Sequence, residues 1–341
     1  MTLRVRAATL GDVAAAAGVS TATASRVLNG SERYVSASLR DRVNAAAREL
    51  SYAANAQAQA VARGHTSYIP LLLSDIADSY FGTLAAAVMR SVESRGFRLT
   101  IAVTERRIER EIELVREFRG QRVRAIVLAG SAYHDETATE PLVGELKLFE
   151  ASGGTVVLVS RTNLPFDNID LDNFDGSRRL AVALARLGYR SVHILAGEEN
   201  LTATRDRVAG FTAGFADKGI TVDEKDLSFS EFSWDGGYRA ILLLEDDVLE
   251  KIDLVFAVND EMALGAVAGL RGRGFRVPDD IAVAGFDDIR TLRNSQPSLT
   301  TVHVPVDEIG EEVANRIDNV AVRRDVIQAT VVLRDSTPRR N

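Results

Sequence analysis

The chain has 341 residues, of which 46% are hydrophobic and 26% charged, a composition typical of soluble globular proteins with two or three domains. It contains no cysteine, which excludes disulfide bridges and thiolate metal sites. The first ten residues, MTLRVRAATL, lack the apolar core of a secretory signal, and no later stretch is long enough to span a bilayer. We therefore expect a cytoplasmic protein without membrane association.

Charge is distributed unevenly along the chain. Residues 1–65 contain eight arginines and four carboxylates, a balance of +4, whereas the whole chain carries −7, so the remainder carries −11. A small basic segment joined to a large acidic body indicates a polyanionic partner for the basic segment. Charge alone also fits a solvated surface on which arginines cluster by chance. The choice between the two interpretations therefore depends on the sequence motifs.

The segment DVAAAAGVSTATASRVLNG, residues 12–30, predicts two short helices at an angle rather than one long helix. Thr9 and Asp12 are spaced to cap each other's amides at the start of the first helix. Gly18 permits the left-handed backbone that ends a helix, and Ser20 is suited to cap the next one. The inward apolar positions are Leu10, Val13, Ala14 and Ala17 in the first helix and Ala24, Val27 and Leu28 in the second. This spacing is typical of a helix-turn-helix.

The second helix has a narrow outward face made of small side chains and one arginine: Thr21, Ala22, Ser25 and Arg26. Such a helix fits the major groove of DNA, where arginine pairs with guanine and the methyl groups of alanine or threonine contact thymine. A third helix is expected after Ser36 as its cap, with apolar residues at Leu39, Val43, Ala46, Ala47 and Leu50. The helical pattern alone leaves open a three-helix bundle without a DNA-binding role.

Residues 9–65 resemble the DNA-binding headpiece of the lactose-repressor/galactose-repressor (LacI/GalR) family of bacterial regulators. The resemblance rests on TLGDVAAAAGVSTATASRVLNG, on VSASLRDRVNAAARELSY and on the segment around Asn55. It implies that Thr21, Ala22 and Arg26 read bases. The other residues that it assigns to DNA, as phosphate contacts or braces of the helix, are Thr9, Ser20, Thr23, Ser25, Asn29 and Asn55.

By the same resemblance, the headpiece spans residues 1–52 and a hinge segment spans residues 53–66. In the family the hinge becomes helical when it pairs with its dimer mate on DNA, and it inserts an apolar side chain into the minor groove. Here that position is Val61 where leucine is usual, and Ala54 replaces the family's proline. Because valine is shorter, a smaller opening of the base step is expected.

From Tyr68 onward, short apolar runs alternate with amphipathic stretches. The runs expected as buried parallel strands are 68–73, 99–103, 125–128, 155–159, 192–195, 254–258 and 281–284; the expected helices include 84–95, 108–119, 177–187 and 261–273. This alternation predicts a doubly wound α/β fold of two units. There is no GxGxxG or Walker-type loop, and the four histidines (65, 134, 193 and 303) lack metal-ligand spacing, so neither a cofactor nor a metal is expected.

This region, residues 67–341, resembles the family's effector-binding core, which is itself similar to periplasmic sugar-binding proteins. The matching segments are SDIADSYF, VLAGS, VLVSR, LDNFDGSRRLA, TRDRVAGF, FAVNDEMALGA, VPDDIAVAGFDD and PSLTTVHVPVDEIG. The resemblance implies two discontinuous lobes, one of about 67–162 with 293–323 and the other of about 163–292 with 324–341. A ligand would bind between them, at the carboxyl ends of the strands.

The family pattern puts effector contacts at Asp75, Tyr80, Phe81, Ser131, Arg205, Arg207, Phe232, Asn259 and Asp287. These aromatic, carboxylate, amide and guanidinium groups suit a small polyol. Structural roles stay open for three of them: Phe232 as core, Asp287 as a helix cap and Arg207 in a local pair. Two departures from the family leave the ligand open, namely Ser160 in place of the usual aspartate and Asp78-Ser79 in place of the common Asn-Pro.

The resemblance therefore implies a sequence-specific DNA-binding transcriptional regulator, most often a repressor, that works as a homodimer on operator DNA. Its effector is expected to be a sugar or sugar derivative, with a nucleoside or purine-type ligand as the alternative. A cytoplasmic solute-binding protein is a further alternative. An enzyme is not expected, because the adjacent acids Asp246-Asp247, Asp279-Asp280 and Asp287-Asp288 point apart and no nucleophile–base pair can be read from the spacing.

Overall fold

The computed structural model describes residues 8–28, 35–53, 64–130, 136–160, 164–317 and 324–340. Its contacts divide the chain into two units, Met1–Thr66 and Ser67–Asn341. Several residues singled out by the sequence lie outside the described ranges: Asn29, Ala54, Asn55, Val61, Ser131 and His134. Within the described residues, no helix is both long and apolar enough to cross a membrane.

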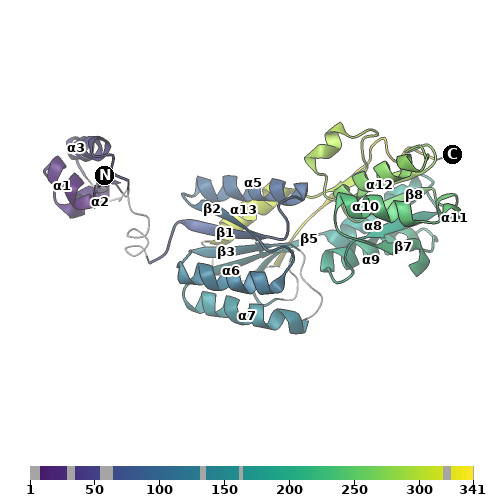
Figure 1. Cartoon of the computed structure of the whole chain (residues 1–341), viewed down its shortest axis with the longest axis horizontal. Helices are drawn as coiled ribbons and strands as arrows, with labels where there is room; N and C mark the ends of the chain where they lie inside the picture. The colour runs from purple at the N-terminus through teal and green to yellow at the C-terminus, as the bar shows by residue number, and fades with distance from the viewer. Residues whose placement is uncertain are drawn as a thin grey trace, which may run out of the picture. The chain divides into compact units, whose positions relative to one another are not determined.

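The first unit contains three helices, α1 (Leu10–Ala17), α2 (Thr21–Leu28) and α3 (Ala37–Glu49) (Figure 1). The predicted break between α1 and α2 is confirmed. Thr9 and Asp12 form a capping box, in which the Thr9 amide donates to an Asp12 carboxylate oxygen at 2.8 Å. Gly18 ends α1 with φ of 61°. The helices enclose a small core of Val13, Ala14, Ala17, Ala24, Val43 and Ala46.

A brace from α3 holds the corner between α1 and α2. Arg42 Nε donates to the carbonyl of Ala17 at 3.1 Å, and its Nη2 donates to the carbonyl of Gly18 at 3.2 Å. Ser20 caps α2 as expected, accepting from the Thr23 amide at 3.1 Å. Ser36 occupies the N-cap position of α3 as expected, but its hydroxyl lies 3.4 Å from that of Ser38 and makes no hydrogen bond to a backbone amide of the helix.

The first lobe of the second unit is built on a six-stranded parallel sheet in the order β11-β5-β4-β3-β1-β2. Its strands are β1 (Tyr68–Leu73), β2 (Arg98–Val103), β3 (Ala125–Ala129), β4 (Thr155–Val159), β5 (Asp167–Leu171) and β11 (Arg324–Ile327). One face is covered by α5 (Ser79–Ser94) and α13 (Val306–Ile317), and the other by α6 (Ile108–Gly120) and α7 (Glu136–Ala151) (Figure 1).

The second lobe is built on a four-stranded parallel sheet in the order β7-β6-β8-β9. The strands are β6 (Val192–Ala196), β7 (Leu227–Phe229), β8 (Leu254–Ala257) and β9 (Ala282–Ala284). The helices pack in two pairs, α8 (Asn173–Arg186) with α9 (Thr202–Ala216) and α10 (Trp234–Leu243) with α12 (Asp260–Gly272) (Figure 1). The short elements are η1 (Glu224–Asp226), α11 (Asp246–Leu249) and η2 (Arg290–Asn294).

An antiparallel ribbon of β10 (Thr301–His303) and β12 (Thr330–Val332) lies beside the second-lobe sheet. Parallel bridges join Ala284 to Thr300 and Asp287 to His303, so this ribbon continues the sheet beyond β9. These bridges matter for the site, because they fix the loop that follows β9.

Strand pairing differs from the lobe boundaries expected from sequence. β5 and β11, expected in the second lobe, pair with the sheet of the first lobe, and β10, expected in the first, joins the second. β5 joins the first-lobe sheet because its buried polar residues, Asp167 and Asn168, have their partner in that lobe. This partner is Arg316 of α13. Arg316 Nη1 donates to Asp167 Oδ1 at 2.6 Å and to the Asn168 carbonyl at 2.7 Å.

Candidate functional site

A pocket lies where the carboxyl ends of strands from both lobes meet. It is lined by Asp78, Tyr80, Phe81, Leu84, Gly130, Val159, Ser160, Leu171, Ala203, Arg207, Phe232 and Asp287. Five residues predicted from sequence are thus brought together: Tyr80, Phe81, Arg207, Phe232 and Asp287. The two departures from the family pattern, Asp78 and Ser160, line the same pocket.

Arg207 is the most heavily bonded side chain of the pocket. It projects from α9, is 4% exposed, and its guanidinium carbon lies 3.9 Å from the centroid of the Phe286 ring. Its Nε donates to Asn173 Oδ1 at 2.9 Å, its Nη1 to the Val258 carbonyl at 2.7 Å and its Nη2 to Asp287 Oδ1 at 2.9 Å. Arg207 therefore pairs across the second lobe and not with a neighbour in sequence.

Asp287 is held in the pocket by an unusual backbone conformation. Its φ is 114°, a region that costs a non-glycine residue on the order of 1–3 kcal/mol, and its amide donates to the Val302 carbonyl at 2.9 Å. The β10 ribbon thus offsets the strain of the loop. Burial raises the pKa of Asp287 to about 6, with Arg207 acting in the opposite direction. Among the described helices, none has Asp287 as its cap; the nearest, η2, is capped by Ile289.

Asp78 lines the pocket, although the sequence pattern marks it only as a departure from the family's common Asn-Pro. It is 7% exposed, and its carboxylate accepts from the Tyr80 amide at 2.9 Å, which starts α5 at Ser79 instead of the expected residue 84. Burial raises its pKa to about 7, and the negative charges of Asp287 and Glu261 act in the same direction. Asp78 belongs to the first lobe and Asp287 to the second, so two carboxylates face one pocket from opposite sides.

Two contacts join the lobes at the edge of this pocket. Ser79 Oγ donates to Glu261 Oε1 at 2.5 Å, and the Arg106 guanidinium lies 5.8 Å from the centroid of the Phe232 ring. Arg106 and its neighbour Glu105 both have positive φ, 55° and 54°, in the turn after β2. Nothing in the sequence pattern singled out Glu261 or Arg106, because each acquires its role only when the lobes meet.

The pocket is small in this arrangement. Its cavity volume is about 40 Å³, room for a few water molecules at roughly 10–15 Å³ of such volume each. A sugar ring or a purine is larger than that. A ligand of either kind can enter only if the lobes or the lining side chains move apart.

Three described residues expected from the family pattern, Asp75, Arg205 and Asn259, do not line the pocket. Asp75 Oδ1 accepts from the Ala77 amide at 2.8 Å, and Arg205 is exposed on α9. Asn259 is buried and caps α12, accepting from the Met262 amide at 2.8 Å. Ser131 lies outside the described residues, although the preceding Gly130 lines the pocket.

The residues predicted to contact DNA gather on and around α2. Thr21, Ala22 and Arg26 are exposed on one side of the helix, whereas Ala24 is buried against α1 and α3. Of the other described residues predicted to contact DNA, Thr9 and Ser20 are exposed and serve as helix caps. Thr23 and Ser25 are half-buried. The geometry therefore presents a short polar ridge supported by a compact core.

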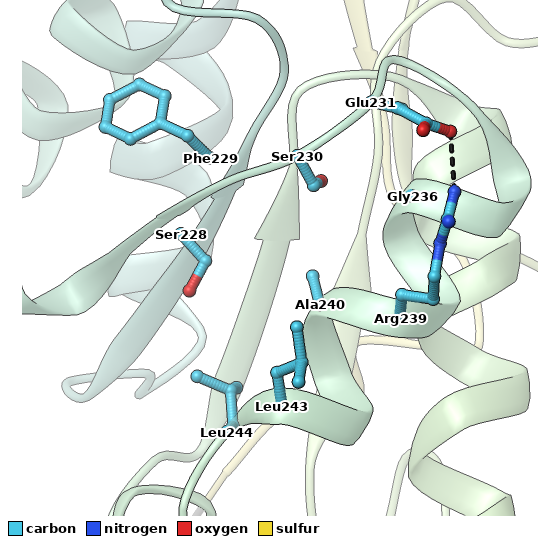
Figure 2. Close-up of a pocket in the computed structure, with 9 residues that line it drawn as sticks. All are labelled: Ser228, Phe229, Ser230, Glu231, Gly236, Arg239, Ala240, Leu243 and Leu244. Atoms are coloured by element: carbon cyan, nitrogen blue, oxygen red, sulfur yellow. Dashed lines mark hydrogen bonds and ion pairs between the residues drawn. The ribbon is translucent and has the colours of Figure 1, made fainter.

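A second hollow, of about 520 Å³, lies between β7 and α10, and none of the predicted residues lines it (Figure 2). Its two charged lining residues, Glu231 and Arg239, pair with each other at 2.6 Å across its rim, as Figure 2 shows. Ala240, Leu243 and Leu244 supply an apolar wall. This hollow offers few polar groups with which to select a ligand.

The adjacent carboxylates and the histidines do not form a reactive site in the described part of the chain. Asp246 and Asp247 pair with Arg273 and Lys251, and Asp279 and Asp280 both pair with Arg276. His193 is buried and bonded to Ser228, and His303 contacts Asp288. Among the described residues, no cluster of three or more His, Cys, Asp or Glu side chains could hold a metal ion.

Comparison with protein families matches both parts of the chain. Residues 9–55 match the family model described as bacterial regulatory proteins, lacI family, and residues 181–337 match the periplasmic binding protein-like domain. The chain is 31% identical over 316 residues to the HTH-type transcriptional regulator CelR of Thermobifida fusca, covering 91% of each. It is 31% identical over 327 residues to the repressor PurR of Erwinia tasmaniensis, covering 95% of this chain and 94% of PurR.

Solved structures show the same likeness. The lac repressor dimer bound to operator and the anti-inducer ONPF has a TM-score of 0.83 at 26% identity, covering 98% of this chain and all of that one. A complex of the transcriptional regulator CelR with cellobiose has a TM-score of 0.69 at 29% identity, covering 96% of this chain and 99% of that one.

Proposed function

The chain belongs to the LacI family of DNA-binding transcriptional regulators, which are not enzymes, and from this premise we propose that it is a repressor released from or recruited to its operator by a sugar-like effector. Its helix-turn-helix headpiece and its periplasmic-binding-protein-like core are those of the family. Membership of the family does not fix the operator sequence or the effector, and the proposal concerns these two.

The observation that carries the DNA-binding proposal is the exposed face of α2. Thr21, Ala22 and Arg26 are exposed, while the buried Ala24 packs α2 against its neighbours and Arg42 braces the corner that precedes it. Arginine can donate to both O6 and N7 of guanine, and small side chains let the helix approach the base edges. We assign base contacts to these three residues. Phosphate contacts fall to Thr9, Ser20, Thr23, Ser25, Asn29 and Asn55, and the minor-groove wedge to Val61.

The effector proposal rests on the pocket between the lobes. Its aromatic side chains, Tyr80, Phe81 and Phe232, can cover the apolar faces of a sugar ring, and Asp287 can accept from hydroxyl groups. The CelR structure contains cellobiose, which favours a sugar. A purine-type ligand is the second candidate, because a stacked ring would use the same aromatic side chains.

We also propose that the working form is a homodimer, as in the lac repressor structure. Two headpieces then read two half-sites of a near-palindromic operator. An effector shifts the equilibrium between lobe arrangements only insofar as it prefers one of them. The lobe contacts of Ser79 and Arg106 are the ones that such a shift would break or keep.

Selection of bound duplexes from a random library by the purified full-length chain tests the DNA part of this proposal. We expect enrichment of a near-palindrome that loses affinity as half-site spacing changes. Equal affinity for enriched and random duplexes, with and without candidate effectors, would contradict it. A thermal-shift screen of sugars against nucleosides tests the effector part, since a ligand at about 100 times its dissociation constant adds roughly 2.7 kcal/mol of stability.

A further inference from the structure

The charges that line the pocket between the lobes do not balance. Three charged side chains line it: Asp78 from the first lobe, and Arg207 and Asp287 from the second. Arg207 and Asp287 pair with each other at 2.9 Å, and both side chains are 5% exposed. Asp78 is left as a carboxylate that is 7% exposed and whose described bond is to a backbone amide.

The cations near Asp78 are already engaged elsewhere. Each of the three nitrogens of Arg207 donates to an atom of the second lobe. Arg106 lies at the rim against the Phe232 ring, and its charge lowers the pKa of Asp78 less than burial and the facing charge of Asp287 raise it. Glu261, across the lobe boundary, adds a further negative charge. At pH values above about 7, where Asp78 is ionised, an anionic ligand would therefore meet excess negative charge inside the pocket.

We propose that Asp78 selects the effector by charge, so that the pocket accepts an uncharged or cationic polyhydroxy ligand and rejects phosphorylated and carboxylated ones. This inference rests on the proposed function only in taking the pocket to be the effector site. Hydroxyl or amine donors of the ligand satisfy the Asp78 carboxylate with charge-assisted hydrogen bonds. A phosphate or carboxylate placed there adds a like charge in a water-poor site, where repulsion is poorly screened.

The first experiment measures ligand binding by the full-length chain and by two variants at pH 8, where Asp78 is ionised. The probes are glucose, galactose and ribose, each against its phosphorylated counterpart, with glucuronate and glucosamine added. Asp78→Asn keeps the shape and removes the charge. Asp279→Asn, at an exposed site that pairs with Arg276, is the matched control. We expect phosphorylated and carboxylated probes to bind at least about tenfold more weakly than the neutral sugar that binds best.

In Asp78→Asn this difference should shrink, whereas in Asp279→Asn it should stay as in the wild-type chain. Tighter binding of a sugar phosphate than of its neutral counterpart by the wild-type chain overturns the inference. So does a difference that is unchanged in Asp78→Asn.

A second measurement needs no ligand, and it tests the inference even if none of the probes binds. Thermal unfolding is followed between pH 5 and pH 9. The wild-type chain should lose stability, relative to Asp78→Asn, as the pH rises through about 7, because ionisation leaves the buried carboxylate unbalanced. Parallel pH profiles for the two chains overturn the inference. Failure of the proposed function gives a different result from these, because the wild-type chain would then show no preference for any DNA sequence.

Discussion

Arg207 and Asp287 are 80 residues apart in sequence, yet they form a 2.9 Å ion pair inside the second lobe with both side chains 5% exposed. α9 carries the arginine and the loop after β9 carries the aspartate, so the pair ties a helix on one face of the sheet to the end of a strand. Because the pair lines the pocket, we expect it to contribute both to the stability of the core and to ligand binding.

Removal of the arginine should destabilise the core strongly. Arg207→Ala leaves Asp287 buried without its partner, and breaking a buried pair in this way costs about 3–5 kcal/mol. Urea unfolding monitored by circular dichroism measures the loss. Arg205→Ala, two residues earlier on the same helix and exposed, is the control and should stay within about 0.5 kcal/mol of wild type. Equal effects of the two variants would contradict the assignment.

The pocket carboxylates make stability depend on pH. The pKa values of Asp78 and Asp287 are raised to about 7 and about 6, so both groups bind protons more tightly in the folded chain than in the unfolded chain. Their contribution is fully present at low pH and is lost as the pH rises through 6 and 7. The groups that face them are Arg207, Arg106, Glu261 and Tyr80.

We expect the double variant Asp78→Asn with Asp287→Asn to show a flatter dependence of unfolding free energy on pH between 5 and 8 than the wild-type chain. Denaturant titrations at four pH values measure it. An equally steep dependence in the double variant would assign the effect to other groups.

The proposed base-reading role of Arg26 predicts a position-specific effect. Arg26→Ala should relax discrimination at one base pair of each half-site, at a cost of about 1–3 kcal/mol for the preferred base. Competition assays with single-base operator variants measure this. A uniform loss of affinity across all sequences would show instead that Arg26 contacts phosphate. Arg48→Ala, near the end of α3 and also exposed, is the control for a general loss of charge.

The brace between α3 and the corner predicts a stability effect without a change in specificity. Arg42→Ala removes the bonds to the carbonyls of Ala17 and Gly18, and should destabilise the headpiece by about 1–3 kcal/mol. Amide hydrogen exchange in α1 and α2 would report it as faster opening. Arg40→Ala, exposed on the same helix, should leave exchange unchanged. Equal exchange rates in the two variants would show that Arg42 does not stabilise the corner between α1 and α2.

Local sequence was sufficient where a few neighbouring residues decide the structure. The capping box of Thr9 and Asp12, the stop at Gly18 and the cap by Ser20 depend on contacts within three or four residues, and each is present as expected. Strands such as β1 and β4 were predicted with the same bounds, because burial on both faces makes them continuous apolar runs.

The pattern was insufficient where a distant partner decides the structure. β5 contains Asp167 and Asn168, which no apolar run announces, and its burial depends on Arg316 from α13. Asp78 could be noted as an unusual residue, but its position opposite Asp287 could not be read from residues 209 positions apart.

The sequence by itself therefore determined the helix-turn-helix, the alternation of strands and helices, and five of the residues that line the pocket. The tertiary structure decided which lobe each of β5, β10 and β11 joins, which charges are balanced, and which side chains meet across the lobes. The physical reason is range: caps and periodic burial act over a single turn or strand, whereas ion pairing and desolvation depend on groups that only folding brings within a few ångströms.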